Sequence, residues 1–176
     1  MRRIAAPLGV FLIVFLAGAS PVPQAPTRTT EESGVIVSPR DGHRVQFSDG
    51  RVLRVKVGPQ STDSTHLVMV EEDLPPGKAI PAHRHDRDEE ILVVQRGSVT
   101  VTLRKGQVEV DKGSIVYLPR GVWISVKNTG SKPATIMAVF AHPDMEQCFR
   151  LLGKTAGRKA TAEELAEEKR LCAWTY

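Results

Sequence analysis

The sequence has few of the features that mark several common classes of protein. Only two of its 176 residues are cysteine and only 5% are aromatic, so a disulfide-dense miniprotein is excluded. The apolar stretch near the N-terminus, Ile4 to Leu16, has 13 residues and is too short to span a bilayer comfortably. No nucleophile elbow, phosphate-binding loop or dinucleotide fingerprint occurs. The remaining composition, 41% hydrophobic and 25% charged, is typical of one globular domain with a sizeable core.

The N-terminal segment has the arrangement of a secretory signal peptide. Arg2 and Arg3 precede the apolar stretch, and Ala17-Gly18-Ala19 provides a small-x-small cleavage site. Cleavage after Ala19 removes two of the 24 basic side chains and leaves 22 against 20 acidic ones, a net charge of +2. That near balance argues against nucleic acid or an anionic membrane as the main partner. We therefore expect an exported protein, periplasmic or secreted, with no stable membrane anchor after cleavage; an uncleaved N-terminal anchor is the alternative.

The middle of the chain has the pattern of an all-β domain. Residues 20–34 are rich in Pro, Thr and Ser and predict a flexible spacer, after which residues 35–142 alternate short apolar runs with turn residues. Ser48-Asp49-Gly50, for example, separates two such runs and predicts a hairpin. Nine or ten strands at intervals of roughly 8–12 residues indicate an antiparallel sandwich or barrel.

The C-terminal tail, residues 143–176, has a helical period instead. Thr161 and Glu164 have the spacing of a capping box and predict a helix over 162–172, and a shorter helix is expected over 144–152. Cys148 and Cys172 lie 24 residues apart, so an oxidising compartment would allow a disulfide that joins the two helical segments. Two free thiols are the alternative.

One short stretch carries residue types suited to chemistry. His83 and His85 are two residues apart, so both imidazoles point to the same face of a strand, and Glu90 opens the next apolar run. Two imidazoles and a carboxylate form a ligand set for a divalent transition metal such as Fe, Mn, Ni, Cu or Zn. A metal-free pocket of hydrogen-bonded polar groups is the alternative.

Other polar residues receive structural interpretations. His66, in an apolar run, is interpreted as a core or hydrogen-bonded histidine. The alternating charges of Arg84, Asp86, Arg87 and Asp88 are interpreted as a solvated loop. No catalytic residue is assigned.

The stretch around these ligands resembles the first motif of the cupin superfamily, Gly-x5-His-x-His-x4-Glu-x6-Gly. It fits from Gly77 through His83, His85 and Glu90 to Gly97. The second motif, Gly-x5-Pro-x-Gly-x2-His-x3-Asn, is matched at four further positions, which are Gly113, Pro119, Gly121 and Asn128. The two motifs cover 52 residues and agree at nine of ten fixed positions. The resemblance implies a jelly-roll β-barrel with the metal ligands inside, and it suggests a homodimer.

The tenth position departs from the family pattern, because Ile124 stands where the family usually has a fourth ligand, a histidine. Isoleucine cannot coordinate a metal, so His83, His85 and Glu90 remain as the metal set. The resemblance then implies an exported single-domain cupin that binds a divalent metal and a small organic molecule, with oxygenase and isomerase as candidate activities. The alternative is a non-enzymatic small-ligand-binding cupin with a degenerate metal site.

Overall fold

The computed structural model describes residues 34–175. The predicted signal peptide and almost all of the predicted spacer therefore lie outside the described residues. Within the described residues, no helix is long and apolar enough to cross a membrane.

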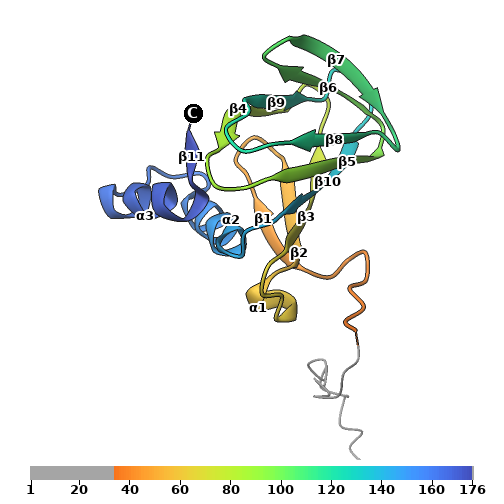
Figure 1. Cartoon of the computed structure of the whole chain (residues 1–176). Helices are drawn as coiled ribbons and strands as arrows, with labels where there is room; N and C mark the ends of the chain where they lie inside the picture. Colours follow the sequence, from red (N-terminus) through yellow and green to blue (C-terminus); the bar gives the residue numbers. More distant parts are fainter. Residues whose placement is uncertain (1–33, 176) are drawn as a thin grey trace, which may run out of the picture. The chain divides into compact units, whose positions relative to one another are not determined.

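Two antiparallel sheets form most of the domain (Figure 1). The six-stranded sheet has, in spatial order, the strands β1 (His43–Gln46), β2 (Val52–Val57), β3 (Val68–Leu74), β10 (Ala134–Phe140), β5 (Glu90–Arg96) and β8 (Ile115–Leu118). The five-stranded sheet has β11 (Trp174–Thr175), β4 (Ala79–His85), β9 (Ile124–Lys127), β6 (Ser98–Leu103) and β7 (Gly106–Asp111). Three helices complete the described chain: α1 (Pro59–Thr62), α2 (Asp144–Thr155) and α3 (Ala162–Cys172).

The prediction of an all-β jelly roll with a C-terminal helical tail is confirmed, although the two sheets do not close into a barrel. No hydrogen-bonded ladder joins the two sheets within residues 34–175, and the edge strands β1, β7, β8 and β11 each pair on one side only. The chain passes between the sheets through connections such as the turn at Gly97. Gly97 has φ of +75°, and a Cβ there would lie 3.2 Å from Ala134 Cα, so glycine permits both the turn and the close approach.

Alternation of apolar residues produces the inner faces of both sheets. Every second residue of β3 is buried, which places Val68, Val70 and Leu74 in the core. The buried side chains form two clusters, one extending onto α2 and α3 and the other between the facing strands. The predicted hairpin at Ser48-Asp49-Gly50 is confirmed, with β1 and β2 antiparallel and Gly50 at φ of +92°.

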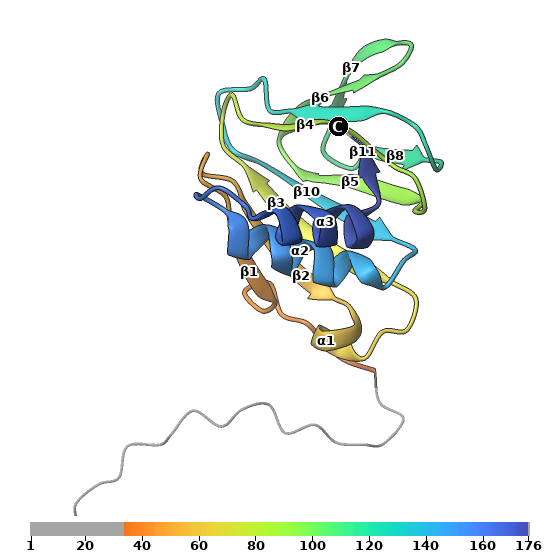
Figure 2. The same ribbon diagram turned by 90° about the vertical axis from the view of Figure 1, so that its left-hand side faces the viewer.

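The C-terminal helices α2 and α3 run side by side (Figure 2) and are linked by a disulfide. Cys148 of α2 and Cys172 of α3 are bonded, with an S–S distance of 2.09 Å, so the disulfide alternative is the one present. The predicted capping box is also confirmed, since Thr161 Oγ1 accepts from Glu164 N and the Glu164 carboxylate accepts from Thr161 N. Directly after α3, β11 pairs with β4, which the sequence pattern did not predict.

Candidate metal centre

β4 brings both histidines to the inner face of the five-stranded sheet. His83 lies opposite Ile124 of β9, and Ile80 lies opposite Val126. Three residues of β4 therefore match two of β9, which is a β-bulge between Ile80 and His83. In a regular strand, residues three apart face opposite sides of the sheet. Because of the bulge, His83 faces inward like Ile80 although it lies three residues further along the chain. Normal alternation then places His85 inward as well, and both imidazoles are buried.

Glu90 faces the two histidines from the other sheet, where it is the first residue of β5 and lies opposite Phe140 of β10. One ligand atom from each of His83, His85 and Glu90 lies within 4.8 Å of the other two. His85 Nε2 is 3.3 Å from Glu90 Oε2, and the two imidazole centroids are 5.0 Å apart. The structure thus brings together the three residues that the sequence proposed as a set.

The protonation of His83 suits a metal ligand. Its Nδ1 lies 2.8 Å from the Pro81 carbonyl oxygen. Because a carbonyl can only accept a hydrogen bond, Nδ1 carries the proton and Nε2 retains its lone pair. Burial also lowers the pKa of His83, partly offset by the same hydrogen bond, so the neutral imidazole is favoured.

The three side chains also fit an ion by distance. Bonds of about 2.1 Å to one ion place neighbouring ligand atoms about 3 to 4 Å apart. His85 Nε2 and Glu90 Oε2 are 3.3 Å apart, and the three ligand atoms all lie within 4.8 Å of one another. Glu90 Oε2 is buried without a hydrogen bond of good geometry, as expected of a carboxylate oxygen that binds a metal ion. The donor set and its placement therefore fit a divalent transition metal.

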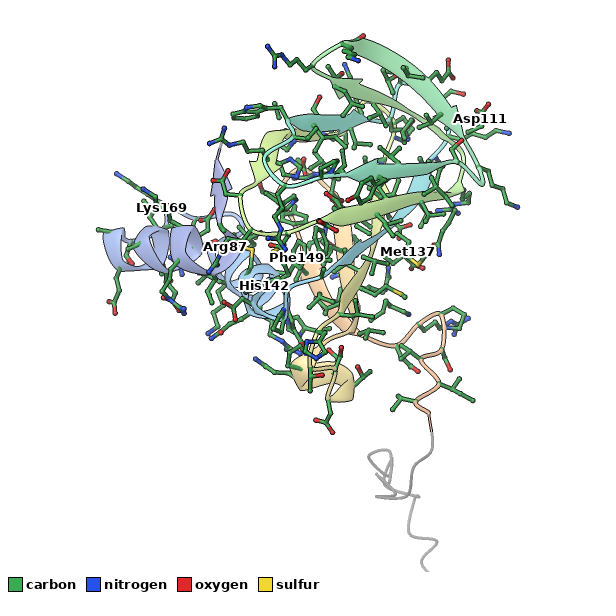
Figure 3. The ribbon with its side chains drawn as sticks, in the orientation of Figure 1. Arg87, Asp111, Met137, His142, Phe149 and Lys169 are labelled. Atoms are coloured by element: carbon green, nitrogen blue, oxygen red, sulfur yellow. A yellow bond between two sulfur atoms is a disulfide. The ribbon has the colours of Figure 1, made fainter. Side chains whose placement is uncertain are left out.

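A cavity of about 150 Å³ adjoins the three ligands. Its walls are mainly aliphatic and aromatic, and Ile124 beside His83 belongs to them. Phe140 and Phe149 also line it, with ring centroids 5.6 Å apart, and Figure 3 labels Phe149 on α2. Besides the three ligands, the ionisable side chains in its wall are Arg51 and Glu72.

Sequence reasoning missed Arg51 and Glu72. Glu72 lies between Val70 and Leu74 at an inward position of β3, and a charged residue at an inward position of an apolar strand was the available signal. Arg51 Nη1 is 2.9 Å from Glu72 Oε1. Burial raises the pKa of Glu72 to about 7, although the nearby Arg51 opposes that shift.

Two interpretations of polar residues need correction, although Asp86 and Arg87 are exposed as expected of a solvated loop. Asp88, expected in a solvated loop, is only 2% exposed, and burial raises its pKa against the opposing charges of His142 and His85. Hydrogen bonds to α3 hold the loop in place. Arg87, which precedes Asp88 and is labelled in Figure 3, donates from Nη2 to the Arg170 and Leu171 carbonyls at 2.6 and 3.3 Å. His66 lies before β3 and is exposed, because the strand begins only at Val68.

The fold is that of a jelly-roll protein, and its buried His-His-Glu group is one that could hold a metal ion. Residues 70–140 match the family model described as Cupin domain, and that segment contains all three ligands. The match covers 71 of the 176 residues and assigns this segment to the cupin superfamily, and a solved structure of a cupin shares the fold.

Two curated proteins are similar to part of the chain. It is 26% identical over 102 residues to the endoribonuclease YbeY of Myxococcus xanthus, covering 58% of this chain and 34% of that protein. It is 24% identical over 88 residues to the tetracenomycin polyketide synthase protein TcmJ of Streptomyces glaucescens, covering 50% of this chain and 59% of that protein. The chain thus spans less than two thirds of the length of either relative.

Among solved structures, a sugar phosphate isomerase of the cupin superfamily from Silicibacter pomeroyi superposes with a TM-score of 0.56 at 18% identity, covering 61% of this chain and 76% of that one. The polyketide cyclase RemF from Streptomyces resistomycificus superposes with a TM-score of 0.54 at 18% identity, covering 61% and 79%. A likeness at this level of identity establishes the fold.

Proposed function

We propose that the protein is an exported cupin that binds a divalent transition metal through His83, His85 and Glu90 and holds a small organic molecule in the adjoining cavity. The observation that carries this proposal is the convergence of three buried ligand atoms within 4.8 Å at the wall of that cavity. Two imidazoles and a carboxylate suit Fe, Mn, Ni, Cu or Zn.

The chain's own groups prepare such a site in two ways. The Pro81 carbonyl fixes the proton of His83 on Nδ1, so Nε2 would be the atom that binds the ion. The apolar walls exclude water and strengthen electrostatic interactions inside the cavity. A bound divalent ion would act as a Lewis acid toward a donor atom of the organic ligand.

For the reaction, we propose oxygenase or isomerase chemistry on that small molecule. The sugar phosphate isomerase among the structural matches supports isomerase activity only through its shared fold. The alternative is a binding protein without catalysis. Ile124 favours it, because this buried isoleucine lies directly opposite His83 and makes that wall of the site apolar.

Elemental analysis of residues 20–176, purified without a histidine tag, tests the metal site. We expect near-stoichiometric transition metal in the wild type, and its loss in His83→Ala. His66→Ala is the matched control, because this histidine is exposed and lies outside the site. Absence of metal after anaerobic reconstitution, or its retention in a His83→Ala/His85→Ala variant, would contradict the proposed site. A small ligand that stabilises the protein equally with and without metal would favour the binding protein.

Export is supported by the disulfide, because such bonds persist in oxidising compartments. Mass spectrometry of the protein from its native host should find a chain that begins at Ser20. A chain that still begins at Met1 would contradict cleavage.

A homodimer is the oligomeric state that we propose. Ile91, Ile115 and Tyr117 are 42%, 69% and 56% exposed, and Ile91 pairs with Tyr117 where β5 meets the edge strand β8. Apolar side chains exposed together in this way are typical of contact surfaces. Light scattering should give twice the monomer mass, and Tyr117→Lys should shift it toward the monomer. A monomer at micromolar concentration in the wild type would refute the dimer.

A further inference from the structure

The cavity has a second polar region besides the three proposed ligands. It consists of Arg51, which immediately precedes β2, and Glu72 of β3, and both side chains line the cavity. Arg51 lies outside the segment 70–140 that matches the cupin family model. The same guanidinium stacks on Phe47, with its carbon 4.5 Å from the ring centroid.

Arg51 has hydrogen-bonding capacity left within the described part of the chain. Its Nε donates to Asp49 Oδ2 at 2.8 Å and its Nη1 donates to Glu72 Oε1 at 2.9 Å. A guanidinium has five N–H donors in a planar fork, so these two bonds leave three donors for a ligand. Those donors belong to a side chain that is only 12% exposed and is fixed by two carboxylates and an aromatic ring.

The positive charge of Arg51 is also incompletely neutralised. Burial raises the pKa of Glu72 to about 7, so this carboxyl is partly protonated at neutral pH. Asp49 is 36% exposed, and solvent screens its interaction with Arg51. Arginine forms strong, charge-assisted hydrogen bonds to carboxylates, frequently through two parallel N–H donors.

The volume of the cavity limits the size of its ligand. A protein cavity of about 150 Å³ lined by apolar side chains is large enough for benzene. Here the apolar lining includes Leu53, Ile124 and Ile136. The ligand should therefore have a compact apolar body of about that size.

We propose that Arg51 is the specificity-determining residue of this cavity and that it binds the carboxylate of a small molecule whose apolar body lies against the aliphatic wall. The proposal deepens the proposed function, since it uses the same cavity, but it requires no contact between the carboxylate and a metal. Glu72 competes with the ligand for the guanidinium, so removal of its charge should favour binding.

Isothermal titration with 3-methylbutanoate and 3-methylbutanamide tests this, because the two probes have the same apolar body and differ in charge. We expect the wild type to bind the carboxylate at least tenfold more tightly than the amide. Arg51→Gln/Glu72→Gln should reduce this preference to less than twofold, and this double variant avoids leaving a buried carboxylate without its partner. Glu72→Gln alone should bind the carboxylate more tightly than the wild type.

Arg54→Gln is the matched control, because Arg54 pairs with Asp73 and does not line the cavity. It should retain the wild-type preference. An equal preference in the Arg51→Gln/Glu72→Gln variant, a preference of the wild type for the amide, or no binding of either probe would overturn the proposal.

The same samples separate this inference from the proposed metal site. Each titration is repeated on His83→Ala/His85→Ala, with the metal content measured. A carboxylate preference that persists there supports Arg51 even if the metal site fails. If the preference for the carboxylate disappears with the metal but is unchanged in Arg51→Gln/Glu72→Gln, the metal binds the carboxylate and the role of Arg51 is overturned.

Discussion

The disulfide between α2 and α3 offers a perturbation whose effect can be calculated. Cys148 and Cys172 are both completely buried, and their bond closes a loop with a sequence separation of 24 residues. In the loop-entropy treatment, removing a crosslink of that span raises the entropy of the unfolded chain and costs about 3.5 kcal/mol. For a domain of this size, about 3 °C per kcal/mol converts that cost to a fall of about 10 °C in Tm.

The structure also predicts where the loosening is greatest. α3 leads directly into β11, whose ladder to β4 pairs Trp174 with His85, and Asp86 N donates to the Ala173 carbonyl at 3.0 Å. Loss of the crosslink should therefore release α3 and β11 before the two sheets unfold.

Calorimetry and hydrogen exchange of Cys148→Ala/Cys172→Ala test both parts. We expect the lower Tm, and faster exchange over 162–175 than over the inner strands β3 and β10. Reduction of the wild type should reproduce both effects, which controls for the cavity left by the alanines. A Tm within 2 °C of the wild type, or uniform exchange throughout the domain, would refute the reasoning.

Three further predictions concern single side chains. Because the pKa of Glu72 is raised from 4.5 to about 7 on folding, its contribution to stability is complete below pH 4.5 and is lost as the pH rises through 7. The free energy of unfolding of the wild type relative to Glu72→Gln, measured with urea, should thus fall by up to about 3 kcal/mol as the pH rises from 4.5 to 7. A difference that does not change with pH would contradict the raised pKa. Ile124→His should tighten zinc binding at least tenfold, as measured by calorimetric titration. Val126→His, two residues along β9 on the same face, should not tighten it. Equal effects of the two substitutions would contradict the position assigned to Ile124. In Gly58→Ala, the new Cβ would lie 2.4 Å from Glu146 Oε2, so chemical unfolding should show a loss of about 1–3 kcal/mol, and wild-type stability would contradict the crowding.

Much of the fold could be predicted from local sequence patterns. Apolar alternation and turn residues predicted the strands, and the capping box at Thr161 predicted the start of α3. The metal set was predictable because His83 and His85 share a strand face and the motif spacing includes Glu90. Each of these signals lies within about 15 consecutive residues.

The features that were missed depend on contacts between distant segments. β11 has two residues, too few for a period, and it pairs with β4 where the chain leaves α3, which the disulfide links to α2. Asp88 is buried although its neighbours are charged, and α3 holds the loop beside it. The Arg51–Glu72 pair joins residues 21 apart in sequence, and only the pairing of β2 with β3 brings them together.

The bulge in β4 makes the site unequally sensitive to changes in chain length. Ile80 and His83 face inward because one extra residue lies between them, so removal of Ala82 would leave a regular strand with both still inward. Removal of Arg84 would instead move His85 to the outer face and dismantle the ligand set. Related chains can therefore differ by one residue before His83 and keep both imidazoles inward, whereas the spacing from His83 to His85 is fixed by the geometry of the sheet.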